Sequence, residues 1–333
     1  MGVDAGRLVI GRRAVLSSLG VVVVAPRAAF AQSPPKPAKI GWLSGQGVPT
    51  SYPIFIDALR EAGFVAGQNL TIERFAPEGS QAEKYPDLAR RLVAGRPDVI
   101  LAANPHSITA VARTTTTVPI VAIDLESDPI ARGWVASLAR PGGNVTGVFL
   151  DIPEMTGKQL QFLTEAKRDV TRVGVLGDPR INELQFRAAE DAARTAGIDV
   201  HRVEARRLEE AADAVSIAAR ARAGALLVLT SPLVLTAART IAEAAVKHQL
   251  PTISLFMPTF AEAGGLLAYG PTFSELFRRA ATYVVRILQG TKAAELPVQR
   301  PEKFELVINL KTARALKLTL QQALLGRADR LIE

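Results

Sequence analysis

Apolar runs and amphipathic stretches alternate along the chain in two long series. In the first series, strand-like segments predict strands at 39–44, 70–75, 99–102, 120–123 and 145–149. The stretches between them have apolar positions at helical spacing and predict helices at 51–62, 81–94 and 107–114. Alternating strands and helices form parallel sheets, so the first series predicts one such sheet. We place a hinge near Leu150, because Pro153 stands where a segment would leave that sheet.

The second series repeats this order without visible sequence identity to the first. It begins with a predicted helix at 155–166, and its predicted strands are 172–176, 199–203, 225–229, 252–255 and 266–269. Helices are predicted between them at 182–196, 209–222 and 235–249. A long amphipathic helix is predicted over 272–289, with Phe277, Ala280 and Val284 on its apolar face. Periodicity alone does not say which sheet this last helix covers.

The stretch Gly11–Ala31 has the features of an export signal. Its apolar run, Ala14–Ala25, is shorter than the roughly 20 residues that a spanning helix needs. Arg12-Arg13 precedes the run, and Ala29-Phe30-Ala31 is a small-x-small cleavage pattern. We therefore predict a signal peptide at 1–31, cleaved after Ala31, and a periplasmic mature protein. The paired arginines indicate the twin-arginine route, with the general route as the alternative, and a buried N-terminal helix is the competing interpretation.

Composition excludes several function classes. The chain has 333 residues, of which 48% are hydrophobic and 22% charged, as in a water-soluble globular protein. Its net charge is +8, but residues 1–31 contribute four arginines against one aspartate, so the remainder carries about +5 without a dense basic block. Nucleic acid is not indicated as a partner. Cysteine is absent, which excludes disulfides, thiolate metal sites and cysteine nucleophiles.

Motifs for cofactor or catalytic chemistry are incomplete. Gly45-Gln46-Gly47 follows the first strand, but Thr50 stands where a dinucleotide-binding fingerprint has its third glycine, so no cofactor is expected. The three histidines lack the spacing of a metal site, and no metal is expected. His248 is interpreted as a structural helix residue, whereas His106, between a strand and a helix, is a candidate ligand contact. No serine lies in a G-x-S-x-G elbow.

Paired acidic residues do not by themselves indicate catalysis. Asp124 with Glu126, and Glu209 with Glu210, are interpreted as solvated loop and helix-start charges. Trp42, in the middle of the first strand, is expected in the core rather than as a stacking platform. The sequence therefore gives no acid–base couple, and we predict that the protein is not an enzyme.

Polar residues at the ends of apolar strands form the predicted ligand site. In open parallel sheets, ligands bind beyond the carboxyl ends of the strands. The residues expected there are Ser44, Gly45, Asn104, Asp124, Asp178, Thr230, Ser231 and Tyr269. Helix N-termini favour a carboxylate and aspartates favour an ammonium, so a zwitterionic amino acid would suit the site. The alternative for Ser231-Pro232 and Asp178-Pro179 is simple helix N-capping.

Two stretches resemble a known family. "TVPIVAIDLESDPIARGWVASLARPGGNVTG" (residues 117–147) and "LPVQRPEKFELVINLKTARALKLTL" (residues 296–320) resemble the ABC-transporter substrate-binding proteins of the tryptophan/tyrosine type. The most specific part is Leu138–Gly147. The sequence departs from the family pattern at Ala103–His106, where a glycine-and-threonine tip is more usual, and at Ser127, where glycine is common. These changes leave the identity of the solute open.

The resemblance implies the fold, partners and role of the protein. The implied fold is the α/β type I periplasmic-binding-protein architecture, with two Rossmann-like lobes and ligand between them. Lobe 1 would comprise 38–148 and 268–300, and lobe 2 would comprise 149–267 and 301–333. The implied role is a monomeric solute-binding component of an ABC importer, which closes about a hinge on a small solute and delivers it to a membrane permease with its ATPase.

Other functions remain as alternatives. A solute-sensing receptor that docks with a membrane signalling protein would have the same lobes. A transcription repressor would need a DNA-binding segment before the first lobe, where the signal peptide is predicted. An exported hydrolase or isomerase would need a nucleophile–base pair, which the sequence does not display.

Overall fold

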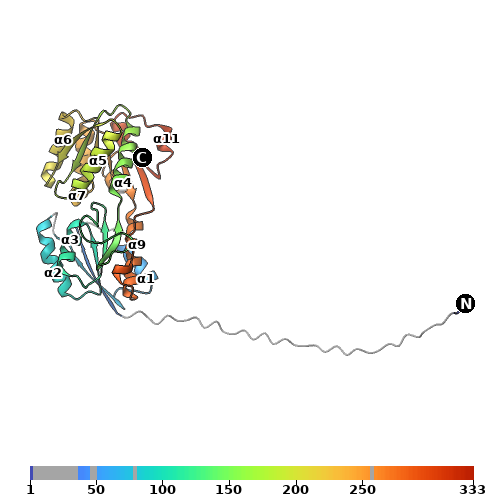
Figure 1. Ribbon diagram of the computed structural model, residues 1–333. Helices are drawn as coiled ribbons and strands as arrows, with labels where there is room; N and C mark the ends of the chain where they lie inside the picture. Colours follow the sequence, from blue (N-terminus) through green and yellow to red (C-terminus); the bar gives the residue numbers. More distant parts are fainter. Residues whose placement is uncertain (3–36, 46–50, 78–80, 256–258) are drawn as a thin grey trace. The chain divides into compact units, whose positions relative to one another are not determined.

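The computed structural model describes residues 1–2, 37–45, 51–77, 81–255 and 259–333 (Figure 1). The predicted signal peptide therefore lies outside the described residues. Pro35–Glu333 forms one unit, and its strands belong to two separate sheets. In the described ranges, each helix is too short or too polar to cross a membrane.

The first sheet has five parallel strands. In chain order they are β1 (Ala38–Ser44), β2 (Leu70–Phe75), β3 (Val99–Ala103), β4 (Ile120–Asp124) and β5 (Val145–Phe149). Their order in the sheet is β2-β1-β3-β4-β5. Neighbouring residues of a strand face opposite sides of the sheet, so Trp42 packs on one face and Leu43 on the other.

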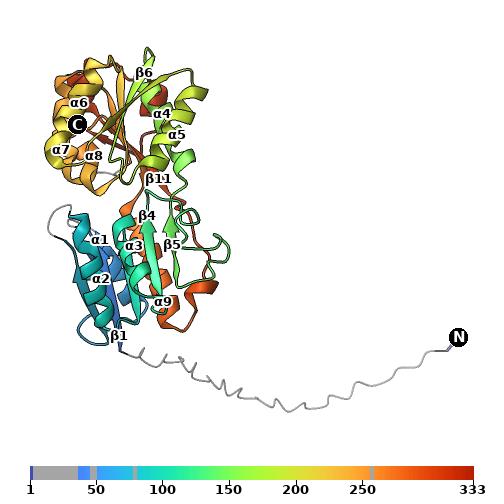
Figure 2. The ribbon, with the colours of Figure 1, turned by 60° about the vertical axis from the view of Figure 1, so that its left-hand side comes forward.

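Helices cover both faces of this sheet (Figures 1 and 2). Its helices are α1 (Ser51–Glu61), α2 (Tyr85–Ala94), α3 (Pro105–Thr114) and α9 (Phe273–Leu288). Helices α1 and α9 pack together on the Trp42 face, and α2 and α3 pack together on the Leu43 face. The long amphipathic helix of the sequence is thus confirmed, and it buries Phe277, Ala280 and Val284 against the first sheet.

The second sheet has seven strands. They are β6 (Arg172–Gly177), β7 (Asp199–Glu204), β8 (Ala225–Val228), β9 (Thr252–Ser254), β10 (Leu267–Pro271), β11 (Phe304–Asn309) and β12 (Arg330–Ile332). Their order is β12-β11-β10-β9-β8-β6-β7, and the β10–β11 pair is antiparallel while the other pairs are parallel.

The helices of the second sheet also form two layers. They are α4 (Ile152–Ala166), α5 (Glu183–Thr195), α6 (Ala211–Arg220), α7 (Pro232–Lys247), α8 (Thr259–Glu262), α10 (Leu310–Ala315) and α11 (Gln322–Leu325). Helices α4 and α5 pack together over one core, and α6 and α7 pack together over the other (Figure 2). Single turns of 3-10 helix lie at Ala82–Lys84, Leu208–Glu210 and Ala293–Glu295.

Most predicted elements are confirmed, and the differences have local causes. Helices α3 and α7 begin earlier than predicted because Pro105 and Pro232 occupy their first turns, where a missing N–H does no harm. The predicted helix at 81–94 is divided into a 3-10 turn and α2. Strands β11 and β12 and helices α8, α10 and α11 have no counterpart in the prediction.

Three segments join the two sheets. The chain leaves the first sheet after β5 and enters α4 at Ile152, returns between β10 and α9, and crosses again between Leu296 and β11. Gln299 in the third segment bonds to strand β5, with its N–H donating to the Gly147 carbonyl at 2.9 Å and its carbonyl accepting from Phe149 N–H at 3.0 Å. Strand β10, which begins at Leu267, pairs in the second sheet, and α9 is the part of the return segment that packs on the first.

Candidate functional site

The carboxyl ends of β1 and β3 bring Ser44, Gly45 and Asn104 close to one another. Ser44 ends β1, is buried, and donates its hydroxyl to the Gly45 carbonyl at 3.2 Å. A Cβ on Gly45 would lie 3.5 Å from the Tyr85 hydroxyl and 3.7 Å from Nδ2 of Asn104. The predicted residues Ser44, Gly45 and Asn104 are therefore neighbours, and Tyr85 joins them.

Asn104 connects β3 to α3 through a backbone conformation that side chains rarely adopt. Its φ is 129°. Its side-chain oxygen accepts the Ser107 N–H at 2.9 Å and caps α3, and its Nδ2 donates to the Tyr85 hydroxyl at 3.1 Å. Such strain is kept mainly where the surrounding structure holds it in place.

Tyr85 and His106 form a stacked pair beside Asn104. Their ring centroids lie 5.6 Å apart with an interplanar angle of 29°. Burial, as the main cause, raises the pKa of Tyr85 to about 12, so its hydroxyl stays protonated. Burial also lowers the pKa of half-buried His106 below its ordinary value, which favours the neutral imidazole at pH 7. The pair thus presents two aromatic rings without a charge.

The loop after β4 holds two buried carboxyl groups and an unpartnered hydroxyl. Asp124 is fully buried; its Oδ1 accepts the Glu126 N–H at 2.8 Å, and its Oδ2 has no partner among the described residues. Burial, and then the charge of Asp124, raises the pKa of Glu126 well above its ordinary value. Ser127 is also buried, and its hydroxyl has no partner in the described chain. The interpretation of Asp124 and Glu126 as solvated charges is wrong, because both residues are buried.

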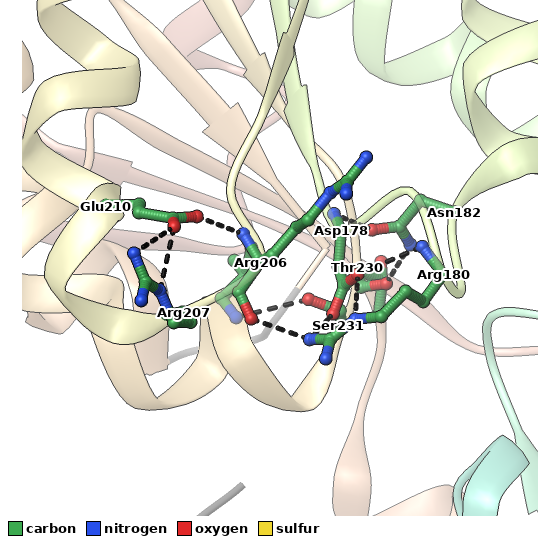
Figure 3. Close-up of polar contacts among 9 residues, drawn as sticks. Asp178, Arg180, Asn182, Arg206, Arg207, Glu210, Thr230 and Ser231 are labelled. Atoms are coloured by element: carbon green, nitrogen blue, oxygen red, sulfur yellow. Dashed lines mark hydrogen bonds and ion pairs between the residues drawn. The ribbon is translucent and has the colours of Figure 1, made fainter. Parts of the chain in front are cut away.

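In the second sheet, Asp178 is paired with Arg180 (Figure 3). Asp178 follows β6, and its two carboxylate oxygens accept from Nε and Nη2 of Arg180 at 2.9 and 2.7 Å. The Arg180 N–H also donates to Asp178 Oδ1 at 3.0 Å, and Nη2 reaches the Arg206 carbonyl at 2.7 Å. Hydrogen bonding to Asp178 is the main cause that raises the pKa of Arg180. The Asp178 carboxylate is therefore engaged by an arginine of its own loop.

Thr230 and Ser231 follow β8 and are both buried. The Thr230 N–H donates to Gln185 Oε1 at 2.9 Å, and its carbonyl accepts from Asn182 Nδ2 and from Gln185 Nε2. The Ser231 hydroxyl accepts the Val234 N–H at 3.2 Å and caps α7, as the alternative interpretation of this turn held. Asn182 Oδ1 also accepts the Asp178 N–H at 2.7 Å, so the loops after β6 and β8 are joined.

Tyr269 packs against the apolar cores of both sheets. It belongs to β10 and packs on Phe162 and Phe304, with ring centroids 4.8 and 6.0 Å away. Its carbonyl accepts from Gln159 Nε2 of α4 at 3.1 Å. The ring of Tyr269 thus contacts apolar side chains of α4 and β11 rather than the loops after β6 and β8.

Charged residues that follow strands of both sheets act on the pKa of His106. Its pKa responds to the charges of Asp124 and Arg132, which follow β4, and to those of Asp178 and Arg180, which follow β6. The loops after β3, β4 and β6 therefore lie within electrostatic reach of one another, although they come from two different sheets. Among the described residues, no group of three His, Asp or Glu side chains is placed to hold a metal ion.

Four residues of this region were missing from the predicted site: Tyr85, Glu126, Ser127 and Arg180. Arg180 and Ser127 had a usable signal, because each follows a predicted strand-end aspartate by two or three positions. Glu126 was noticed in the sequence but interpreted as solvated. Tyr85 had none, since it opens a helix far from any strand end.

The comparison with protein families decides the class of the chain. The family described as ABC transporter substrate binding protein matches residues 40–332. The chain belongs to this family. Its members are solute-binding proteins of ABC transporters, so the chain is a substrate-binding protein.

Relatives of known structure or name agree with this family. The "Tyrosine-binding protein" of Clostridioides difficile (strain R20291) is 25% identical over 266 residues, which are 79% of this chain and 75% of that protein. A conserved domain protein from Vibrio cholerae matches with a TM-score of 0.83 and 24% identity, over 89% of this chain and 100% of its own. A domain from Streptococcus pneumoniae in complex with L-Trp matches with a TM-score of 0.80 and 23% identity, over 89% and 99%. These structures confirm the predicted fold class.

Proposed function

We propose that this substrate-binding protein captures a zwitterionic amino acid between the carboxyl edges of its two sheets and delivers it to the permease of an ABC importer. The family supports the transporter, and two relatives support the class of solute: one is named a tyrosine-binding protein and another was crystallised with L-Trp. The permease and its ATPase are the partners, and the protein acts as a monomer without chemical conversion of the solute.

The single observation that carries the proposal is the fully buried carboxylate of Asp124, whose Oδ2 accepts no hydrogen bond from an N–H or hydroxyl group of the described residues. A buried carboxylate oxygen without a hydrogen bond is costly, and a cationic ligand group removes that penalty. Burial, the charge of Asp124 and a side-chain hydrogen bond to Asp124 raise the pKa of the neighbouring Glu126, which stays protonated, so the pair holds one negative charge rather than two. One charge matches one ammonium group. The Ser127 hydroxyl, also buried without a partner, supplies a second acceptor.

Ligand capture would act through the hinge. We propose that the lobes follow the predicted division, 38–148 with 268–300 and 149–267 with 301–333, except that β10 stays with the second sheet. A solute that contacts both lobes stabilises the closed form, because only there are all its contacts available. The three joining segments, one of which is bonded to β5 through Gln299, would bend during closure.

A binding experiment tests the ammonium site. Isothermal titration calorimetry of the purified protein against the twenty L-amino acids should show at least one ligand. Asp124→Asn should weaken that ligand by about 10- to 100-fold, because an ammonium–carboxylate bond is worth roughly 1.5–3 kcal/mol. Asp199→Asn is the matched control: Asp199 is exposed, begins β7 and pairs with Arg172 at the opposite ends of the strands. Equal binding by wild type and Asp124→Asn would remove Asp124 from the site.

A solute-sensing receptor remains the second candidate for the same fold. Binding alone does not separate it from an importer component. Uptake of the identified amino acid by cells that lack this protein does, because loss of uptake supports transport and unchanged uptake supports sensing.

A further inference from the structure

Asp178 and Arg180 form an ion pair in which burial is strongly unequal. The side chain of Asp178 is 2% exposed and that of Arg180 is 53% exposed. The carboxylate therefore lies under the guanidinium, inside the edge of the second sheet. Sequence patterns favoured Asp178 as an acceptor for a ligand ammonium, but both of its oxygens already accept from Arg180. The loop after β6 therefore offers a ligand the hydrogen-bond donors of the Arg180 guanidinium rather than the acceptor oxygens of Asp178.

Three different loops hold this donor in place. The Asp178 N–H donates to Asn182 Oδ1 at 2.7 Å, and Nδ2 of Asn182 donates to the Thr230 carbonyl in the loop after β8. Nη2 of Arg180 donates to the Arg206 carbonyl after β7 (Figure 3). Within the described part of the chain, Nη1 of Arg180 donates no hydrogen bond, so its two protons remain for another acceptor. An arginine fixed in this way loses little further side-chain freedom on binding an anion.

The guanidinium belongs to the loop after β6, at the carboxyl end of a strand of the second sheet, where ligands of open parallel sheets bind. Its charge lowers the pKa of His106, at the start of α3, and the charge of Glu83 in the 3-10 turn before α2 acts on Arg180. His106 also responds to Asp124. Arg180, which follows a strand of the second sheet, and Asp124, which ends a strand of the first, thus both act on the charge of His106.

We infer that Arg180, positioned by Asp178, binds the anionic group of the solute, so that the site selects solutes with both a cationic and an anionic group. This inference rests on the proposed function and extends it: Asp124 of the first sheet takes the ammonium and Arg180 of the second takes the carboxylate. A solute with both charges connects the lobes. An amine without the carboxylate binds to the first lobe alone and gains nothing from closure.

A competing role for Arg180 is a latch to Glu83. In that case Arg180 would stabilise the closed form whatever the solute, and its removal would weaken every ligand by the same factor. The two roles differ in one measurable quantity, the ratio between the affinities for an amino acid and for its decarboxylated amine.

The test measures this ratio by calorimetry. The probes are the L-amino acid that binds wild type most tightly among the twenty and the amine that its decarboxylation yields. Arg180→Gln should weaken the amino acid by about 10- to 100-fold, since a charge-assisted hydrogen bond is lost, and should leave the amine within about threefold. Arg180→Lys should recover part of the affinity for the amino acid, because the charge remains but the fixed geometry does not. Arg194→Gln, which alters an exposed ion pair at the far end of α5, is the control and should change neither.

Asp178→Asn tests positioning separately from stability. The ratio of affinities should fall toward that of Arg180→Gln, and the melting temperature reports any structural damage on its own. A lower melting temperature with an unchanged ratio would make Asp178 purely structural and overturn its positioning role.

The remaining outcomes are distinguishable. Equal weakening of amino acid and amine by Arg180→Gln would establish the latch and overturn this inference. Unchanged amino-acid affinity in Arg180→Gln, together with loss in Asp124→Asn, would overturn it while the proposed function stands. Absence of binding by all twenty amino acids would overturn the proposed function, and this inference with it.

Discussion

Asn104 donates a side-chain hydrogen bond to the hydroxyl of Tyr85 at 3.1 Å while its backbone has a φ of 129°. The bond joins the tip of β3 to the first turn of α2. The same side chain caps α3 through Ser107, so two contacts hold a residue in a conformation that favours glycine. Strain and hydrogen bonding therefore oppose each other at one position beside the candidate site.

Asn104→Ala and Asn104→Gly should separate these two contributions. Each variant loses the cap and the bond to Tyr85, but only glycine relieves the strained backbone. We expect the alanine variant to be less stable than the glycine variant by about 1 kcal/mol. Urea denaturation of the three proteins measures the difference. Equal stability of the two variants would show that φ at this position carries no strain.

Tyr85 should make the protein sensitive to alkali. Its pKa is raised from 10.0 to about 12 in the folded state, so the neutral hydroxyl stabilises the fold fully below pH 10. Between pH 10 and 12 the unfolded chain ionises first, and stability should fall by about 1.4 kcal/mol per pH unit from this group.

Tyr85→Phe is the comparison for the alkaline effect. The variant lacks the ionising group, so its free energy of unfolding should depend less steeply on pH in this window. It should also be about 1 kcal/mol less stable at pH 7, because Asn104 Nδ2 loses its acceptor. Parallel curves for wild type and variant between pH 10 and 12 would contradict the assignment.

His106 should make the free energy of unfolding fall at acid pH, whereas Tyr85 makes it fall at alkaline pH. Burial, partly offset by the charge of Asp178, lowers its pKa below 6.5, and the charges of Arg180 and Arg132 act in the same direction as burial while Asp124 opposes it. The stability that neutral His106 contributes is present above pH 6.5 and is lost as the pH falls below it. Titration of the imidazole carbon-bound protons by NMR should give a pKa below 6.5. His106→Gln should flatten the dependence of stability on pH in this range, and a ring that titrates above 6.5 would refute the prediction.

The N-terminal stretch makes a separate prediction about export. We propose that the mature protein begins at Gln32 and is periplasmic, so mass spectrometry of the periplasmic fraction should find Gln32 as its first residue. Replacement of both signal arginines, Arg12→Lys with Arg13→Lys, should retain the precursor in the cytoplasm, because the twin-arginine route requires the pair. Normal export of the double variant would assign the general route instead. A periplasmic protein with an intact leader would contradict the cleavage site.

Local patterns were sufficient for most of the fold. Strands β2 and β5 were predicted with their observed bounds, because β5 (VTGVF) is a short, mostly apolar run and β2 (LTIERF) begins with alternating apolar and polar residues. Strand β12 was missed because it has three residues and pairs only with β11 at the edge of the sheet, and β11, with six residues, was missed as well. Such short edge strands depend on a partner distant in sequence, which no local window contains.

For the candidate site, too, the sequence predicted which residues gather at the strand ends but not how their side chains contact one another. The rule that ligands meet at the carboxyl ends of strands placed Ser44, Gly45, Asn104 and Asp124 in one region from sequence. It could not foresee that Arg180 occupies both oxygens of Asp178, because the distance between two side chains depends on how a loop folds. The different surroundings of Asp124 and Asp178, one with an unpartnered oxygen and one without, are likewise invisible in the sequence.

The sequence by itself determined the class of the protein, since the periodicity of apolar residues fixes strands, helices and parallel sheets, and two family-like stretches pointed to a solute-binding protein. Tertiary structure alone decided which charges face a ligand. Burial and hydrogen bonding set the protonation and availability of each polar group, and both depend on residues brought together from distant parts of the chain.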